Sequence, residues 1–111
     1  MLKVLNENTA VIVDFWASWC GPCMRFKPTF EALAKENNNP KIVFCAVETD
    51  KARDAAQANN VSSIPQFNFY FNGKEHAKFV GANEATFRKH LSELQSMTNS
   101  KSAFHSSMNF R

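Results

Sequence analysis

The chain has 111 residues, a length that suits one compact domain able to bury its own core. Its formal net charge of +3 is too small for a nucleic-acid-binding surface, which needs basic residues clustered on one face. No apolar run is long enough to cross a bilayer and the first residues lack the pattern of a signal peptide, so we expect no membrane association and a cytoplasmic location.

The first half of the chain alternates strand and helix patterns. Residues 9–17 (TAVIVDFWA) are β-branched and aromatic, which is typical of a buried central strand. Apolar residues at helical spacing follow from Gly21, and this helix should end at the breaker formed by residues 37–40. Residues 41–47 (KIVFCAV) predict a second strand, and a helix over residues 50–58 should begin with Asp50 as its N-cap.

The second half predicts a hairpin followed by a helix. Residues 67–71 alternate as Phe-Asn-Phe-Tyr-Phe, a period-two strand, and the turn at Asn72-Gly73 leads into another strand that ends at Val80. Asn83 should cap the last helix, which carries its apolar residues on one face.

The order of these elements, β-α-β-α-β-β-α, belongs to the α/β class. The first two strands flank a crossover helix and should pair in parallel, whereas the last two form an antiparallel hairpin. Residues 96–111 are rich in Ser, Thr and Asn, so we expect one domain over residues 1–95 followed by a polar, flexible tail.

Two of the three cysteines, Cys20 and Cys23, bracket the turn between the first strand and its helix. A helix N-terminus favours a thiolate, the attacking species in disulfide exchange, so Cys20 is the expected exposed nucleophile and Cys23 the resolving thiol. Cys45 is expected to be a buried inert thiol, with a regulatory or intermolecular disulfide as the alternative. A zinc site at the pair would need two more ligands, and we expect no metal because the remaining candidates are isolated in the sequence: Cys45, His76, His90 and His105.

Several segments resemble one family. Residues 19–23 (WCGPC) match the active-site signature of the thioredoxin family, and the rest of the family pattern follows in order: residues 14–17 (DFWA), Pro28, Ile64-Pro65 and residues 79–83 (FVGAN). The last segment is more similar to the eukaryotic cytosolic members. The resemblance implies the thioredoxin fold, a central mixed β-sheet flanked by helices. We expect four strands, because the eight residues before Thr9 are too few for the family's first strand and helix.

The resemblance also implies roles for individual residues. Asp14 resembles the buried carboxylate that exchanges a proton with the resolving thiol, and burial should raise its pKa. Many bacterial members place a lysine near that carboxylate, where this chain has Ala46, so the pKa of Asp14 should lie higher still. Pro65 resembles the family's cis-proline. The groove that receives a substrate segment should include Trp19, Gly21, Pro22, Ile64, Gly81 and Ala82.

The implied function is that of a protein-disulfide reductase, a dithiol–disulfide redox carrier. Pro22 occupies the position at which oxidising relatives carry histidine, and this favours a reductant. The implied partners are a thioredoxin reductase and disulfide-containing clients such as peroxiredoxins, with no bound cofactor and with NADPH involved only through the reductase. Two alternatives remain open: a disulfide isomerase-type domain, and a thioredoxin-like redox or adaptor module of a larger assembly.

The short start has a consequence for the sheet. Without a further strand beside it, the strand over residues 41–47 forms an unprotected edge, since no charge or proline interrupts its apolar stretch. We expect this edge to be covered by weak self-association or by docking of the 96–111 tail. The expected oligomeric state is therefore a monomer or a weak dimer.

Overall fold

The computed structural model describes the backbone of residues 2–107 and the side chains of residues 3–98. No helix in this part of the chain combines the length and the apolar character needed to span a membrane. The elements follow one another as α1 (Leu2–Glu7), β1 (Ala10–Trp16), α2 (Gly21–Glu36), β2 (Ile42–Glu48), α3 (Arg53–Ala58), β3 (Gln66–Phe71), β4 (Lys74–Val80) and α4 (Glu84–Ser107).

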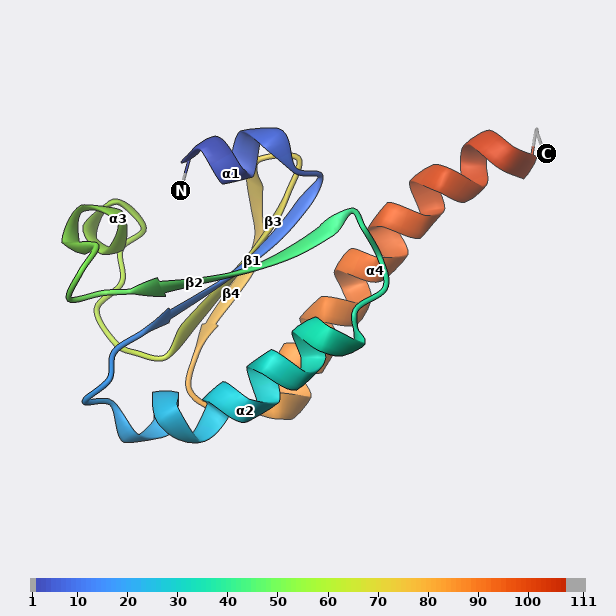
Figure 1. Cartoon of the computed structure of the whole chain (residues 1–111). Coiled ribbons are helices and arrows are strands. Elements are labelled where there is room, and N and C mark those ends of the chain that lie inside the picture. The colour runs from blue at the N-terminus through green and yellow to red at the C-terminus, as the bar shows by residue number, and fades with distance from the viewer. Residues whose placement is uncertain (1, 108–111) are drawn as a thin grey trace.

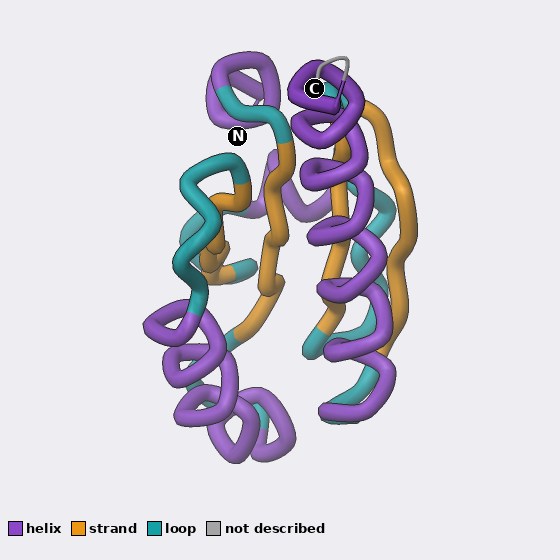
Figure 2. The backbone as a smooth tube through the Cα atoms, turned by 90° about the vertical axis from the view of Figure 1, so that its right-hand side faces the viewer, coloured by secondary structure: helices purple, strands orange, loops and turns teal. Residues whose placement is uncertain are grey.

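A mixed four-stranded sheet with the order β2-β1-β3-β4 forms the centre of the fold. β1 pairs in parallel with β2 and antiparallel with β3, and β3 pairs antiparallel with β4. Figure 1 shows α2 and α4 on one side of this sheet and α1 and α3 on the other. Figure 2 shows α4 running alongside the strands in the view turned by 90°. The expected fold and strand pairing are thus confirmed, and β2 lies at an edge of the sheet as expected.

Phenylalanine fills the largest apolar cluster among the described residues, on the α2 and α4 side of the sheet. Phe26 from α2 lies 4.9 Å from Phe67 of β3 between ring centroids, and Phe87 from α4 lies 5.3 Å from Phe67. Tilted and edge-on ring pairs of this kind add about 0.5–1.5 kcal/mol each beyond the apolar area that they bury. This cluster fixes the start of α2 against the sheet, and therefore fixes the position of the cysteine pair.

Two predicted helix caps have different outcomes. Asn83 caps α4 as expected, because its Oδ1 accepts a hydrogen bond of 3.0 Å from the backbone N–H of Thr86. The prediction that Asp50 caps α3 is wrong, since the helix begins at Arg53 and its N-cap is Ala52, without a side-chain cap bond. The Asp50 carboxylate instead contacts the redox site, as described below.

The ends of the chain also differ from the predicted elements. A short helix, α1, occupies residues for which only a lead-in was predicted. The predicted domain boundary at residue 95 falls inside α4, whose backbone is helical to Ser107, and Thr98 is buried and accepts a hydrogen bond of 2.9 Å from Asn39. Flexibility of the 96–111 tail stays a prediction, and residues 108–111 lie outside the described residues.

Candidate redox site

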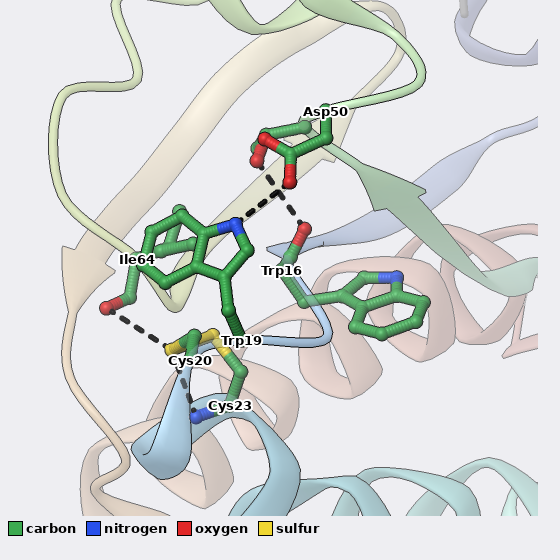
Figure 3. The surroundings of a disulfide bond; sticks show 7 residues. Trp16, Trp19, Cys20, Cys23, Asp50 and Ile64 are labelled. Atoms are coloured by element: carbon green, nitrogen blue, oxygen red, sulfur yellow. Dashed lines mark hydrogen bonds between the residues drawn. A yellow bond between two sulfur atoms is a disulfide. The ribbon is translucent and has the colours of Figure 1, made fainter.

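The cysteine pair lies at the connection between β1 and α2. Cys20 is the N-cap residue of α2, in extended backbone conformation, and Cys23 lies in the first turn of the helix. Their Cα atoms are 5.2 Å apart and their sulfur atoms form a disulfide bond. Figure 3 shows this bond beside Trp19 and Ile64. A pair at this spacing can cycle between a dithiol and a disulfide without movement of the backbone.

The first turn of α2 supplies a hydrogen-bond donor to the sulfur of Cys20. The backbone N–H of Cys23 donates to Sγ of Cys20 over 3.1 Å. In the reduced form, the same donor and the positive end of the helix dipole favour a thiolate on Cys20, because both stabilise negative charge. This geometry agrees with the predicted nucleophile.

Solvent exposure does not separate the two cysteines in the disulfide form. Cys20 is 5% exposed and Cys23 is 3% exposed, so the expectation of an exposed Cys20 is wrong for this form. Their surroundings do separate them. Sγ of Cys20 lies 3.8 Å from the carbonyl oxygen of Ile64 on the loop before β3, whereas Cys23 lines a pocket together with Asp14.

The loop before β3 brings the predicted Pro65 to the cysteine pair. The Ile64–Pro65 bond is cis, and Pro65 is buried. The backbone N–H of Gly81 donates to the carbonyl oxygen of Pro65 over 2.9 Å, which anchors the loop after β4 beside it. Gly81 has φ +112°, a conformation that disfavours any side chain. Ala82 follows and is exposed on the surface.

Apolar side chains are exposed on both sides of the disulfide. Trp19 is 69% exposed, while Gly21 and Pro22 are exposed at the start of α2. Val80 is 54% exposed beside Gly81 and was not among the predicted groove residues. Exposed apolar residues around a buried reactive group are typical of a docking surface for another protein.

Asp50 is a contact of the site that sequence reasoning missed. The indole N–H of Trp19 donates to Oδ2 of Asp50 over 2.7 Å, across 31 positions of sequence, as Figure 3 shows. The segment that carries Asp50 is itself attached to β1, since the backbone N–H of Thr49 donates to the carbonyl oxygen of Trp16 over 2.9 Å. Asp50 thereby orients an indole that is otherwise held little by packing.

Asp14 is a buried carboxylate on the central strand. It is 7% exposed, and its Oδ1 has no hydrogen-bond partner among the described residues. Desolvation by burial raises the pKa of Asp14 to about 7. Ala46 lies directly opposite Asp14 in the parallel register, so the position predicted to lack a cation is indeed adjacent to the carboxylate.

A pocket of about 130 Å³ connects this carboxylate with the second cysteine. It is lined by Asp14, Trp16, Cys23, Lys27, Phe30, Glu31 and Ala46. A space of this size admits water, which can carry a proton between a carboxylate and a thiol that do not touch. Lys27 was not singled out in the sequence, although its position four residues after Cys23 puts it on the same face of α2. Its ammonium lies 5.4 Å from the centre of the Trp16 ring.

Cys45, His76 and His90 lie outside the redox site. Cys45 is free and half-buried on β2, and burial raises the pKa of its thiol, as expected for an inert group. Among the described residues, no group of three metal-binding side chains includes Cys20 or Cys23. The expectation that the histidines are isolated is wrong for His76 and His90, which meet in a separate cluster with Glu93.

Comparisons with known proteins agree with this geometry. The thioredoxin family profile matches residues 2–93. Thioredoxin of Ictalurus punctatus is 40% identical over 83 residues, which cover 75% of this chain and 78% of that protein. The X-ray structure of Fasciola hepatica thioredoxin superposes with a TM-score of 0.77 at 42% sequence identity, covering 82% of this chain and 88% of that one.

A longer protein also contains a similar segment. Peptide-N(4)-(N-acetyl-beta-glucosaminyl)asparagine amidase of Caenorhabditis briggsae is 39% identical over 106 residues, which cover 92% of this chain but only 17% of that protein. An alignment of this extent has to run beyond residue 93, where the family match ends.

Proposed function

This chain belongs to the thioredoxin family of thiol–disulfide oxidoreductases, and we propose that it works as a protein-disulfide reductase that donates electrons through Cys20 and Cys23. The observation that carries the proposal is the shared pocket: it connects the second cysteine with a carboxylate whose pKa lies near neutrality. The family acts on disulfide-containing proteins through its own redox-active disulfide. No further cofactor is needed in the reaction below.

The reaction proceeds by two exchanges. The Cys20 thiolate attacks one sulfur of the client disulfide, which forms a mixed disulfide and releases the other client sulfur as a thiolate. The carboxylate of Asp14 takes the proton of the Cys23 thiol through the pocket, and the Cys23 thiolate then attacks Sγ of Cys20. The client leaves with its second thiolate, and two electrons have moved from the Cys20–Cys23 pair to the client.

The client segment would bind around the disulfide. The carbonyl of Ile64 faces Cys20, and the backbone at this position can pair with an extended segment as a strand edge does. Trp19, Pro22 and Val80 would contact its side chains, because they are exposed around the reactive sulfur. Gly81 and Ala82 would line the other side, where a missing or small side chain leaves room for the client backbone.

Pro22 sets the direction of electron flow in this proposal. A thioredoxin has a reduction potential of roughly −270 mV, against roughly −180 mV for a disulfide isomerase, a difference of roughly 4 kcal/mol. A potential near the lower value would make the chain a donor recharged by a thioredoxin reductase, with NADPH as the indirect source. Peroxiredoxins are the proposed clients and the cytoplasm is the proposed compartment. A potential near the higher value would favour the isomerase-type alternative.

An insulin-reduction assay with dithiothreitol tests the proposed activity. The wild-type chain should accelerate reduction of the insulin disulfides, and Cys20→Ser should abolish that acceleration. Cys45→Ser is the matched control, since Cys45 lies outside the site and its removal should leave the rate unchanged. Acceleration that survives Cys20→Ser would contradict the proposal.

A second candidate follows from the longer relative. The amidase similarity covers nearly all of this chain and supports the alternative that the domain serves as a redox or adaptor module of a larger protein. The Cys20–Cys23 disulfide and the buried Asp14 favour a module that keeps redox activity over a purely structural one. Joint replacement of both cysteines separates the two: an adaptor would keep its function, and a redox module would lose it.

A further inference from the structure

Two histidines and a glutamate meet between β4 and α4, away from the redox site. Oε1 of Glu93 lies 2.8 Å from Nε2 of His76 and 2.9 Å from Nδ1 of His90. The three candidate ligand atoms all lie within 4.8 Å of one another. We propose that His76, His90 and Glu93 form a binding site for a divalent transition-metal ion, with Zn²⁺ as the preferred ion.

A β-bulge directs His76 toward this cluster. In the β3–β4 register, Phe69 pairs with Ala77 and Tyr70 pairs with Glu75, so His76 is an extra residue without a partner. In a regular strand, residue 76 would face away from Ala77, which packs on the α4 side of the sheet. The extra residue changes that alternation, and His76 reaches Glu93 on α4. Bulges commonly re-aim a side chain in this way.

The other two ligands come from α4 and are held in place. His90 and Glu93 are three residues apart, which puts them on the same face of the helix. The His90 ring lies 5.3 Å from Phe69 and 6.0 Å from Phe79 between ring centroids. These contacts limit rotation of the imidazole, so that Nδ1 stays directed at Glu93.

The donor set and its spacing fit zinc. Zn²⁺ takes imidazole nitrogen at about 2.0–2.1 Å and carboxylate oxygen at about 2.0–2.2 Å, so tetrahedral donor atoms lie about 3.3 Å apart. The separations of Glu93 Oε1 from the His76 and His90 nitrogens, 2.8 and 2.9 Å, are within about half an ångström of that value. The third separation, between the two imidazole nitrogens, is no longer than 4.8 Å. Small side-chain rotations can therefore bring the atoms to zinc geometry. All three side chains are partly exposed, which lets the ion enter and lets water complete the fourth position.

Metal binding would link the β3–β4 hairpin to α4. His76 belongs to β4, whereas His90 and Glu93 belong to α4, so one ion would join two elements that otherwise meet through apolar packing. An ion that binds only the folded state raises the melting temperature by mass action. The proposed metal site shares no residue with the redox pocket. We therefore expect the metal ion to stabilise the fold without changing the rate of disulfide reduction.

Cobalt and zinc titrations of the untagged, disulfide-bonded protein test the site, because oxidation removes Cys20 and Cys23 as competing ligands. Co²⁺ should bind at one ion per chain with visible d–d absorption and without a thiolate-to-cobalt band in the near ultraviolet. Zn²⁺ should displace it and raise the melting temperature, and a chelator should reverse the rise. His76→Gln and Glu93→Gln should each weaken binding by about tenfold or more.

Two variants serve as matched controls. Glu75→Gln removes the carboxylate of the residue next to His76, which pairs with Tyr70 in the β3–β4 register. His105→Gln removes the third histidine of the chain. Both should bind as the wild type does. The proposal is overturned if no ion binds at micromolar concentrations, if the cluster variants bind as well as the wild type, or if a thiolate band appears. It is also overturned if either control loses binding.

Discussion

The indole N–H of Trp19 donates a hydrogen bond to the carboxylate of Asp50 over 2.7 Å, although 31 positions separate the two residues. Trp19 is 69% exposed, so this bond is its main restraint on the surface around the disulfide. The contact links the loop before the cysteine pair with the segment between β2 and α3. Replacement of Asp50, which lies outside the family signature, is therefore expected to affect the reduction of a client disulfide.

Asp50→Ala should lower kcat/KM for a protein disulfide while leaving the melting temperature nearly unchanged. A side-chain hydrogen bond of this kind is worth about 0.5–1.5 kcal/mol, which corresponds to roughly a two- to tenfold loss if the indole orientation matters for client binding. Asp50→Asn keeps an oxygen acceptor and should lose less. Insulin reduction at several substrate concentrations measures the effect, and equal rates for Ala and wild type would show that the contact does not position Trp19.

Cys20→Ser and Cys23→Ser should behave differently toward clients. Cys20 accepts the Cys23 backbone N–H and faces Ile64, so it should attack first, while Cys23 lies toward the Asp14 pocket and should resolve. Cys23→Ser should accumulate a mixed disulfide, and Cys20→Ser should not. Mass spectrometry of non-reduced adducts compares the two. Equal trapping by both variants would reverse or remove the assignment of roles.

Asp14→Asn should slow disulfide reduction near pH 7 and stabilise the fold increasingly as the pH rises. The carboxyl has a folded pKa of about 7 and a reference value of 3.8, so the native state binds this proton more tightly than the unfolded state does. Below the unfolded pKa, the group costs nothing. As the pH rises from about 4 to the folded value, the native state loses relative stability, by on the order of 4 kcal/mol in full.

Melting curves from pH 4 to pH 8 decide this prediction. The stability advantage of Asp14→Asn over wild type should be smallest at pH 4 and should grow up to about pH 7. Glu31→Gln is the matched control, because Glu31 lines the same pocket from α2 but is exposed to solvent. A constant difference between variant and wild type across this range would mean that Asp14 titrates normally.

Sequence patterns predict the local structure correctly where the neighbouring residues in the chain determine it. The run around Asp14 predicts a buried strand because every flanking residue is apolar, and Asn72-Gly73 predicts a tight turn because both residues adopt positive φ there. The WCGPC signature predicts a helix start because Pro22 is favoured in the first turn.

Features that depend on contacts between residues far apart in the sequence could not be predicted from local patterns. The pattern before α3 suggests Asp50 as a cap, but the long-range partner Trp19 takes its carboxylate. The composition after residue 95 indicates a polar tail, and no local pattern reveals that α4 continues to Ser107 with Thr98 buried against Asn39. The bulge at His76 follows from pairing between β3 and β4, which no local pattern reveals, and it brings together side chains that look isolated in the sequence.

The last prediction concerns the exposed edge of β2, whose outward-facing groups can be identified from the ladder. The backbone N–H of Ala10 donates to Lys41 and that of Thr49 donates to Trp16, with Ala10 opposite Ile42 and Trp16 opposite Glu48. In a parallel ladder, the residues whose N–H groups bond to β1 alternate with residues whose N–H groups face outward. Thr49 belongs to the inward set, and residues 42, 44, 46 and 48 therefore carry outward N–H groups.

We expect this edge to pair with a second copy of the chain at high protein concentration, since a helical backbone over residues 96–107 cannot supply strand-type hydrogen bonds to it. Ala46→Pro should abolish the association, because Ala46 is exposed and its N–H is in the outward set. Val43→Pro is a poor test by comparison, as it removes an inward bond to β1 and weakens the fold. Sedimentation across a range of concentrations measures the apparent mass of wild type and Ala46→Pro at matched melting temperature. A wild-type mass that stays at the monomer value would contradict pairing at this edge, and so would a dimer that persists in Ala46→Pro.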